Sequence, residues 1–232
     1  MNQPLQTNHR QVIGGSGIAV NRQRVLQNTY WLLALSMVPT VLGAWVGVST
    51  GIMAALGFGV STIVFLVGAF GLLYVIEKTK NGSMGVVALL GFTFFMGLML
   101  SRLLAQILGF SNGSSLIMMA FGGTGAIFFA MASLATVIKR DLSGMGKFLF
   151  VGAVILLVVG LGNIFFQSTA LMLTVMALSM AVFSAFMLYD IKRVIDGGET
   201  NYISATLAIY LDVYNVFQSL LSLLGIFGGE RD

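Results

Sequence analysis

The chain has 232 residues, a formal net charge of +4, 57% hydrophobic residues and only 9% charged residues, and its mean hydropathy is +0.96. Soluble domains carry about 25% charged residues, so this composition excludes a water-soluble globular protein and indicates one whose solvent is lipid. The positive charge does not indicate nucleic-acid binding, because the basic residues stand in short clusters between apolar runs, as membrane topology signals do.

The predicted elements begin after a polar segment. Residues 1–24 carry three arginines and no acidic residue, so we expect a flexible cytoplasmic tail there. Residues 25–232 alternate apolar runs long enough to cross a bilayer, about 20 residues each, with short charged or turn-forming segments. This pattern predicts an all-α transmembrane domain of seven helices, near residues 29–48, 52–76, 85–101, 116–138, 148–166, 169–189 and 205–227.

The basic residues orient these seven helices. Ten of the twelve lysines and arginines fall on the side of the amino terminus, and only Arg102 and Arg231 fall on the other. Cytoplasmic loops carry the excess of basic residues. We therefore expect a multi-pass protein of the bacterial inner membrane, with a cytoplasmic amino terminus and a periplasmic carboxyl terminus.

Small residues recur at close-packing spacing in several predicted helices. They are Gly43 and Gly47, then Gly122, Ala126 and Ala130, then Ala181 and Ala185. Such spacing lets helix backbones approach each other in lipid. The favoured interpretation is packing within one chain, and specific dimerisation is the alternative; the sequence does not predict an oligomeric state.

The last predicted helix has one polar face. Asp212, Asn215, Ser219 and Ser222 are spaced by 3, 4 and 3 residues, which puts them on one side of a helix. Asp212 is also the only carboxylate well inside an apolar run, and an ionisable residue in the membrane is by default a functional hypothesis. We expect this face to point to protein or water and the helix to be central in the bundle.

A second acid is a candidate partner. Asp190 ends the preceding apolar run, at the end where the last helix begins. Two carboxylates in a low dielectric cannot both ionise readily, so such a pair can share a proton near neutral pH and act as a proton switch. When ionised, the pair offers the hard oxygen ligands that Ca²⁺ prefers. The alternative is structural: Asp212 pairs with Lys192 or Arg193, or caps backbone.

Enzyme motifs are incomplete in this sequence. Residues 109–113 match G-x-S-x-G, but the single histidine, His9, is predicted on the opposite side of the membrane, so no Ser–His pair can form. The Tyr189–Asp190 pair is similar to one motif of intramembrane aspartyl proteases, whose second motif, Gly-x-Gly-Asp, does not precede Asp212. There is no cysteine to act as nucleophile or thiolate ligand. We expect a non-enzymatic protein without a resident cofactor.

Several segments resemble a known family. They are GGETNYI at 197–203, YLDVYNVF at 210–217, LLSLLG at 220–225, VLQNTY at 25–30 and GLGNIF at 160–165. Together they resemble the Bax-inhibitor-1 family, in particular its bacterial YccA-like branch. The resemblance implies two three-helix layers around a central seventh helix.

The family resemblance also implies a pH-sensitive Ca²⁺ leak through paired aspartates, whose positions Asp190 and Asp212 match; any Ca²⁺ binding there would be transient. In the similar prokaryotic member an arginine after the second helix latches the acid pair. Here that stretch reads EKTK at 77–80, so Lys78 or Lys80 could replace the arginine, or the latch is absent.

The YccA-like branch implies a different function, as an inhibitor and slow substrate of the membrane AAA protease FtsH, and a tail over residues 1–24 would suit engagement by a protease. The leading interpretation is the cation leak, and the protease modulator is the alternative. A leak should depend on the two carboxylates and not on the tail, whereas a modulator should show the reverse. A structural or stress-response scaffold would depend on neither.

Overall fold

The computed structural model describes the backbone of residues 8–230 and the side chains of residues 21–230 apart from that of Phe58, and all regular elements in this part of the chain are helices. The helices are α1 (Asn8–Thr50), α2 (Ile52–Ala55), α3 (Gly57–Thr79), α4 (Ser83–Leu108), α5 (Gly113–Val137), α6 (Met145–Phe166), α7 (Thr169–Ile195) and α8 (Tyr202–Gly228). Within these bounds, seven helices are long and apolar enough to cross a membrane, all except the single-turn α2. This confirms the predicted number of spans.

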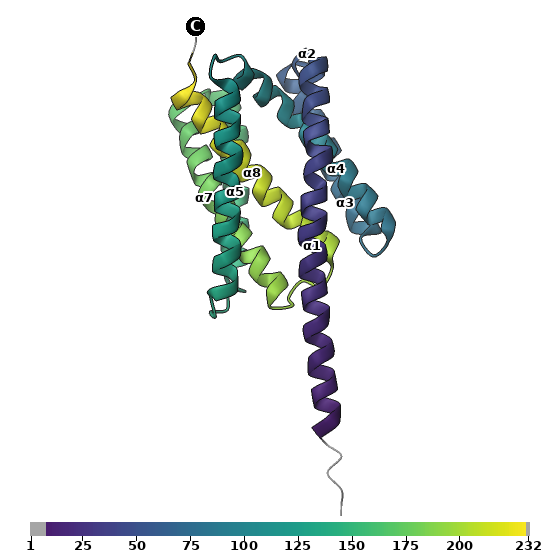
Figure 1. Cartoon of the computed structure of the whole chain (residues 1–232). Helices are drawn as coiled ribbons and strands as arrows, with labels where there is room; N and C mark the ends of the chain where they lie inside the picture. The colour runs from purple at the N-terminus through teal and green to yellow at the C-terminus, as the bar shows by residue number, and fades with distance from the viewer. Residues whose placement is uncertain (1–7, 231–232) are drawn as a thin grey trace, which may run out of the picture.

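The first helix is longer than the sequence predicted. It begins at Asn8 rather than near residue 29, so the backbone of residues 8–24 is helical where we expected a flexible tail; residues 1–7 of that tail lie outside the described residues. Adding residues to an existing helix is far cheaper than nucleating one, so the membrane-spanning part of α1 can propagate into its polar flank. This extension projects beyond the rest of the bundle (Figure 1).

Other bounds differ because charged residues do not end these helices. α4 continues through Arg102 to Leu108, and Ile107 in the added turns is 3% exposed. α7 continues past residue 189 to Ile195, where cations in the last turn are favoured by the helix dipole. The predicted helix over 52–76 is instead divided into α2 and α3 at Gly57, whose φ of +70° suits glycine.

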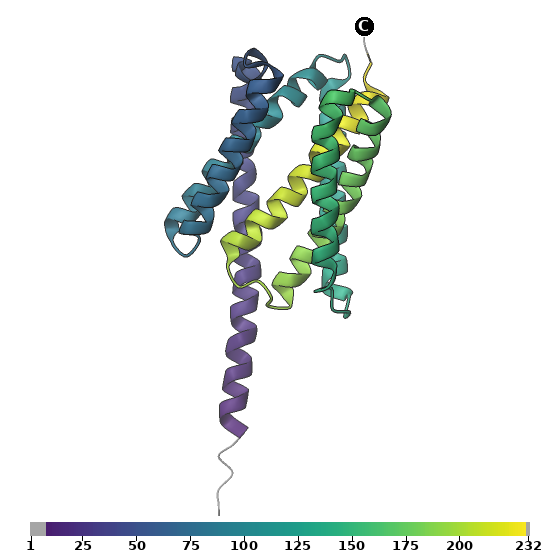
Figure 2. The same ribbon diagram turned by 180° about the vertical axis from the view of Figure 1, so that it is seen from behind.

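The spanning helices form two groups joined by α8. α1 and α3 pack on α4, while α5 and α6 pack on α7. α8 contacts α1 and α4 of the first group and α5 and α7 of the second, and it runs obliquely between them (Figures 1 and 2). Its central position is as predicted, and α8 has the largest buried share of any span. The arrangement of the two groups as layers stays a prediction.

The interior is apolar, and so is much of the surface. The main core cluster joins Phe92 of α4, Ile191 of α7 and Tyr210 of α8, all at most 1% exposed. On the outside, Phe148 and Phe165 of α6 are 80% and 87% exposed. Water would penalise such a surface, whereas lipid tails accept it.

Glycines bring α1 and α4 into close contact. A Cβ atom at Gly97 would lie 2.0 Å from the carbonyl oxygen of Thr40, and one at Gly43 would lie 2.1 Å from that of Phe94. The predicted role of Gly43 in packing within the chain is therefore confirmed. The Gly122, Ala126 and Ala130 stripe of α5 is instead exposed, so packing within the chain was the wrong interpretation for that stripe.

The loops gather at two ends of the bundle. The α3–α4 turn (80–82), the α5–α6 loop (138–144) and the α7–α8 loop (196–201) lie together at what we term the charged end. The contacts are direct: Asn201 donates a hydrogen bond to Lys80 O, and Arg22 of α1 lies against Gly197. At the opposite end, Asn112 donates to Gly228 O. Which end faces the cytoplasm stays a prediction.

Candidate functional site

The two candidate acids lie in contact between α7 and α8. The carboxyl groups of Asp190 and Asp212 lie close enough to interact with each other. Asp190 lies near the end of α7, just after its apolar run, and Asp212 lies in the third turn of α8. Because α7 and α8 are antiparallel neighbours linked by a short loop, the end of one helix faces the start of the other. The chain topology therefore brings together two acids that are separate in sequence.

The contact has a chemical requirement. Asp212 is 4% exposed, and its Oδ2 atom has no hydrogen-bond donor from any group of the described region. Ionised carboxylates only accept hydrogen bonds, so a bond between two carboxyl groups needs one proton on the pair. Two unprotonated carboxylates at this position would repel each other in a medium of low dielectric. One shared proton would relieve this repulsion, and the role of the pair as a proton switch stays a prediction.

The nearby cations are engaged elsewhere. Lys192 Nζ lies 2.6 Å from Asp196 Oδ1, and Arg193 Nη2 lies 3.4 Å from Glu199 Oε2. Neither forms an ion pair with Asp212, which was the structural alternative from the sequence. That alternative is therefore wrong for these two partners.

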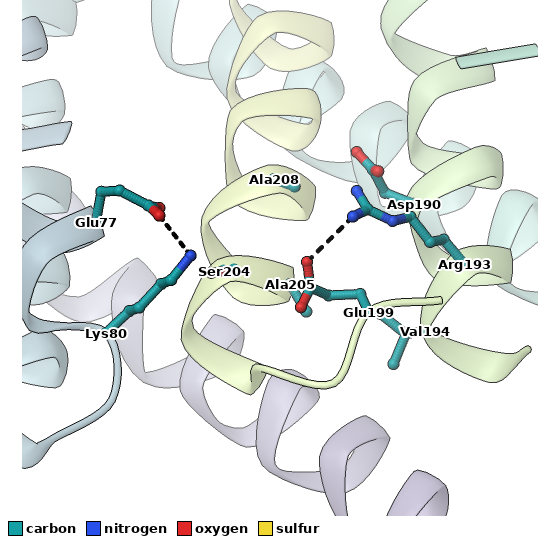
Figure 3. A pocket seen from close by; sticks show the side chains of 9 residues that line it. All are labelled: Glu77, Lys80, Asp190, Arg193, Val194, Glu199, Ser204, Ala205 and Ala208. Carbon is teal, nitrogen blue, oxygen red and sulfur yellow. Dashed lines mark hydrogen bonds and ion pairs between the residues drawn. The ribbon is translucent and has the colours of Figure 1, made fainter. Parts of the chain in front are cut away.

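A pocket of about 230 Å³ reaches Asp190 from the charged end. Its walls come from the end of α3, the end of α7, the α7–α8 loop and the first turns of α8 (Figure 3). The lining residues are Glu77, Lys80, Asp190, Arg193, Val194, Glu199, Ser204, Ala205 and Ala208. Asp212 follows Ala208 by one helical turn, so the pocket ends close to the acid pair.

The two candidate latch residues behave differently. Lys80 lines the pocket together with Asp190, but its Nζ bonds Glu77 Oε1 at 2.5 Å rather than Asp190. Lys78 Nζ lies 5.5 Å from the centroid of the Tyr74 ring, and it is absent from the pocket lining. Of the two, only Lys80 shares the pocket lining with Asp190, and the latch itself stays a prediction.

The remaining members of the polar face follow Asp212 along α8. Ser219 and Ser222 are buried, and Asn215 is partly buried with its amide donating to Leu211 O at 2.7 Å. This confirms that the polar side of α8 faces protein. Within the described residues, no three His, Cys, Asp or Glu side chains converge as a metal site.

The α7–α8 loop has a defined conformation that the sequence analysis did not single out. Gly197, with a φ of +80°, follows the end of α7, and the Gly198 amide donates to Arg193 O while the Gly197 amide donates to Val194 O. This is a Schellman motif, which terminates a helix with a left-handed glycine. The Gly-Gly pair after two basic residues was the signal that could have predicted it.

Two further loop residues complete the charged end. Glu199 accepts hydrogen bonds from the amides of Thr200 and Asn201 at 2.9 Å each, in addition to its ion pair with Arg193. The Asn201 side chain caps α8 by accepting from the amides of Ile203 and Ser204. Both residues belong to the segment 197–203 that carries the family resemblance, but the sequence did not predict either of them as a site residue.

An α-helical bundle of seven apolar spans, with an acid pair between its last two helices, defines a multi-pass membrane protein. The chain belongs to the Bax1-I family, described as inhibitor of apoptosis-promoting Bax1, whose match covers residues 22–229. The match begins in α1 and ends just after α8, so every spanning helix belongs to it.

Curated relatives are similar over nearly the full chain. An uncharacterized membrane protein of Vibrio cholerae is 41% identical over 211 residues, covering 89% of this chain and 91% of the relative. The modulator of FtsH protease YccA from Escherichia coli K12 is 36% identical over 206 residues, again covering 89% and 91%. A relative from Escherichia coli O6:H1 with the same identity and coverage is named inner membrane protein YccA.

Proposed function

We propose that this chain is a non-enzymatic modulator of a membrane-anchored AAA protease of the FtsH type. The observation that carries the proposal is the similarity to the Escherichia coli modulator of FtsH protease, which extends over 91% of that relative at 36% identity. Similarity over 89% of this chain is not confined to one motif. It supports a shared partner better than it supports any particular ion.

The shape of α1 suits this function. Its amino-terminal turns project beyond the bundle at the charged end (Figure 1), and we propose that this end faces the cytoplasm because it carries most of the basic residues. Backbone outside a packed domain is where proteases first engage a chain. A protease could therefore bind residues 2–24 without first unfolding the bundle, while the packed spans resist further extraction.

The test is a degradation assay with purified FtsH in the same bilayer. We expect the wild-type chain to co-purify with FtsH and to slow the degradation of a membrane reporter substrate. Deletion of residues 2–24 should abolish the slowing, and Asn at both Asp190 and Asp212 should leave it intact. If the folded wild-type chain neither binds FtsH nor slows the reporter, the proposal is wrong.

A second candidate function is a proton-controlled cation leak, which a different observation favours. The contact between Asp190 and Asp212 provides a shared-proton site, and the pocket leads to it from the charged end. In this proposal the ionised pair binds Ca²⁺ transiently, and Lys80 is the candidate latch. The polar face with Asn215, Ser219 and Ser222 would continue the path along α8.

Ca²⁺ flux into proteoliposomes between pH 5 and 8 tests the leak. We expect a pH-dependent flux that D190N and D212N each reshape, whereas deletion of residues 2–24 should leave it unchanged. Flux no higher than that of empty liposomes would overturn this second candidate. Because the two assays depend on different parts of the chain, the failure of one function leaves the test of the other intact.

A further inference from the structure

Asn201 connects three segments at the charged end. Its Oδ1 atom accepts hydrogen bonds from the amides of Ile203 and Ser204 at 2.9 and 3.1 Å, which caps the first turn of α8. Its Nδ2 atom donates to Lys80 O at 3.0 Å and to Asn81 Oδ1 at 3.1 Å. The oxygen therefore belongs to α8, and the amide nitrogen reaches across to the α3–α4 turn.

The same residue is linked to the opposite wall of the pocket. The backbone N–H of Asn201 donates to Glu199 Oε1. The other carboxylate oxygen of Glu199 pairs with Arg193 of α7. A continuous series of polar contacts thus passes from α7 through the loop to the end of α3. Asp190 belongs to the α7 wall of the same pocket and lies beside Arg193 (Figure 3).

The wall formed by α3 is attached to the bundle mainly by apolar packing. α3 packs mainly on α4 and α2, while its last turn supplies Glu77 and Lys80 to the pocket. Ile76 joins the apolar core cluster. Apolar contacts between helices are only weakly favoured in a membrane, because lipid tails can replace the lost neighbour. Directional hydrogen bonds at the end of α3 should therefore have a large influence on its position.

We propose that Asn201 is a positioning residue that holds the end of α3 against the first turn of α8 and thereby limits access from the charged end to Asp190. Loss of the two hydrogen bonds from its side-chain Nδ2 atom lets the α3–α4 turn move away and widens the pocket. This inference concerns access to the acid pair and depends on neither proposed function.

The Asn201→Asp variant separates the two roles of the side chain. Asp and Asn are about equally good helix caps, so the carboxylate still accepts from the α8 amides. It cannot donate to Lys80 O, so the connection to α3 is lost. Asn81→Ala is the matched partial variant, because it removes one acceptor and leaves the Lys80 carbonyl in place.

The readout uses the fact that the chain has no cysteine. Ala208→Cys places a thiol in the pocket lining, and its reaction rate with a cationic, membrane-impermeant thiosulfonate is measured in lipid nanodiscs, where both ends are open to the reagent. We expect Asn201→Asp to raise this rate roughly five- to tenfold, as the loss of two hydrogen bonds allows. Asn81→Ala should give a smaller increase.

A thiol at the opposite end detects general loosening. Ser49→Cys lies at the exposed end of α1, and its rate should not change with Asn201→Asp. An unchanged rate at position 208, a rise at both positions, or no reaction at position 208 in either background would overturn the proposal. If Asn201→Asp does not fold, Asn201→Ser provides the same comparison, because serine also caps a helix and its short side chain lacks the amide donor.

Discussion

The carboxyl groups of Asp190 of α7 and Asp212 of α8 face each other inside the bundle, while Lys192 and Arg193 form ion pairs with Asp196 and Glu199. One proton shared by the two carboxyl groups would remove their mutual repulsion. A folded state that binds one more proton than the unfolded state loses stability as the pH rises. This relationship has consequences for stability that are independent of transport.

Thermal unfolding of the wild-type protein in detergent should therefore depend on pH. We expect the midpoint temperature to fall as the pH rises from 5 to 8, because the shared proton is lost. Asp212→Asn should flatten this dependence, since an amide donates to the Asp190 carboxylate without a bound proton. Equal slopes for the two proteins would contradict a proton-dependent contact.

Asp141 provides the matched control for that experiment. Hydrogen bonds from the backbone amide and hydroxyl of Ser143 lower the pKa of this exposed carboxyl below its ordinary value. A carboxyl with a lowered pKa contributes stability above its ordinary pKa and loses it only as the pH falls below that value. Asp141→Asn should therefore leave the slope between pH 5 and 8 unchanged.

Cysteine labelling should determine the orientation of the chain. Thr200→Cys in the α7–α8 loop and Ser49→Cys at the end of α1 lie at opposite ends of the bundle, and both positions are exposed. In intact spheroplasts, an impermeant reagent should label Ser49→Cys and leave Thr200→Cys unlabelled until the membrane is opened. The reverse pattern would place the charged end outside.

Close packing of α1 on α4 should not tolerate a methyl group. Gly97→Ala would drive a Cβ into the Thr40 carbonyl oxygen, and overpacking of this kind costs about 1–3 kcal/mol. We expect a lower midpoint temperature of unfolding. Gly122→Ala is the control, because no atom lies within 4 Å of a Cβ built there, and its midpoint should stay within error of the wild type.

The hydroxyl of Tyr210 should contribute to the attachment of α8 to α1. Tyr210 is 1% exposed, and its hydroxyl oxygen lies 2.9 Å from Thr40 Oγ1. The same hydroxyl also lies 3.4 Å from Thr93 O of α4. Tyr210→Phe removes both contacts and should destabilise the protein by about 0.5–1.5 kcal/mol or more, since each hydrogen bond usually contributes that much. Tyr74→Phe, at an exposed ring on the outer surface, should have no comparable effect; equal losses would show that the Thr40 contact is not responsible.

Helix ends were the weakest part of the prediction from sequence. The rule that a charge ends a membrane span failed at Arg102 and at Asp190, which both lie inside helices. Long cationic side chains can extend towards the interface from within a helix, and the last turn of a helix favours cations. The hydrogen-bonded geometry of a terminus, such as the Gly197 turn, decides where the helix stops.

The sequence by itself determined the class of protein, the number of spans and the polar face of α8, because hydropathy and helical periodicity are properties of neighbouring residues. It also identified Asp190 and Asp212 as candidates, since an ionisable group next to apolar runs is conspicuous. Only the tertiary structure decided which partners the charges take: Lys192 with Asp196, Arg193 with Glu199 and Lys80 with Glu77. It alone revealed Asn201 as a connection between α8 and the α3–α4 turn. Such pairings depend on where distant helix ends meet in space, and that position follows from the packing of the whole bundle rather than from any local pattern.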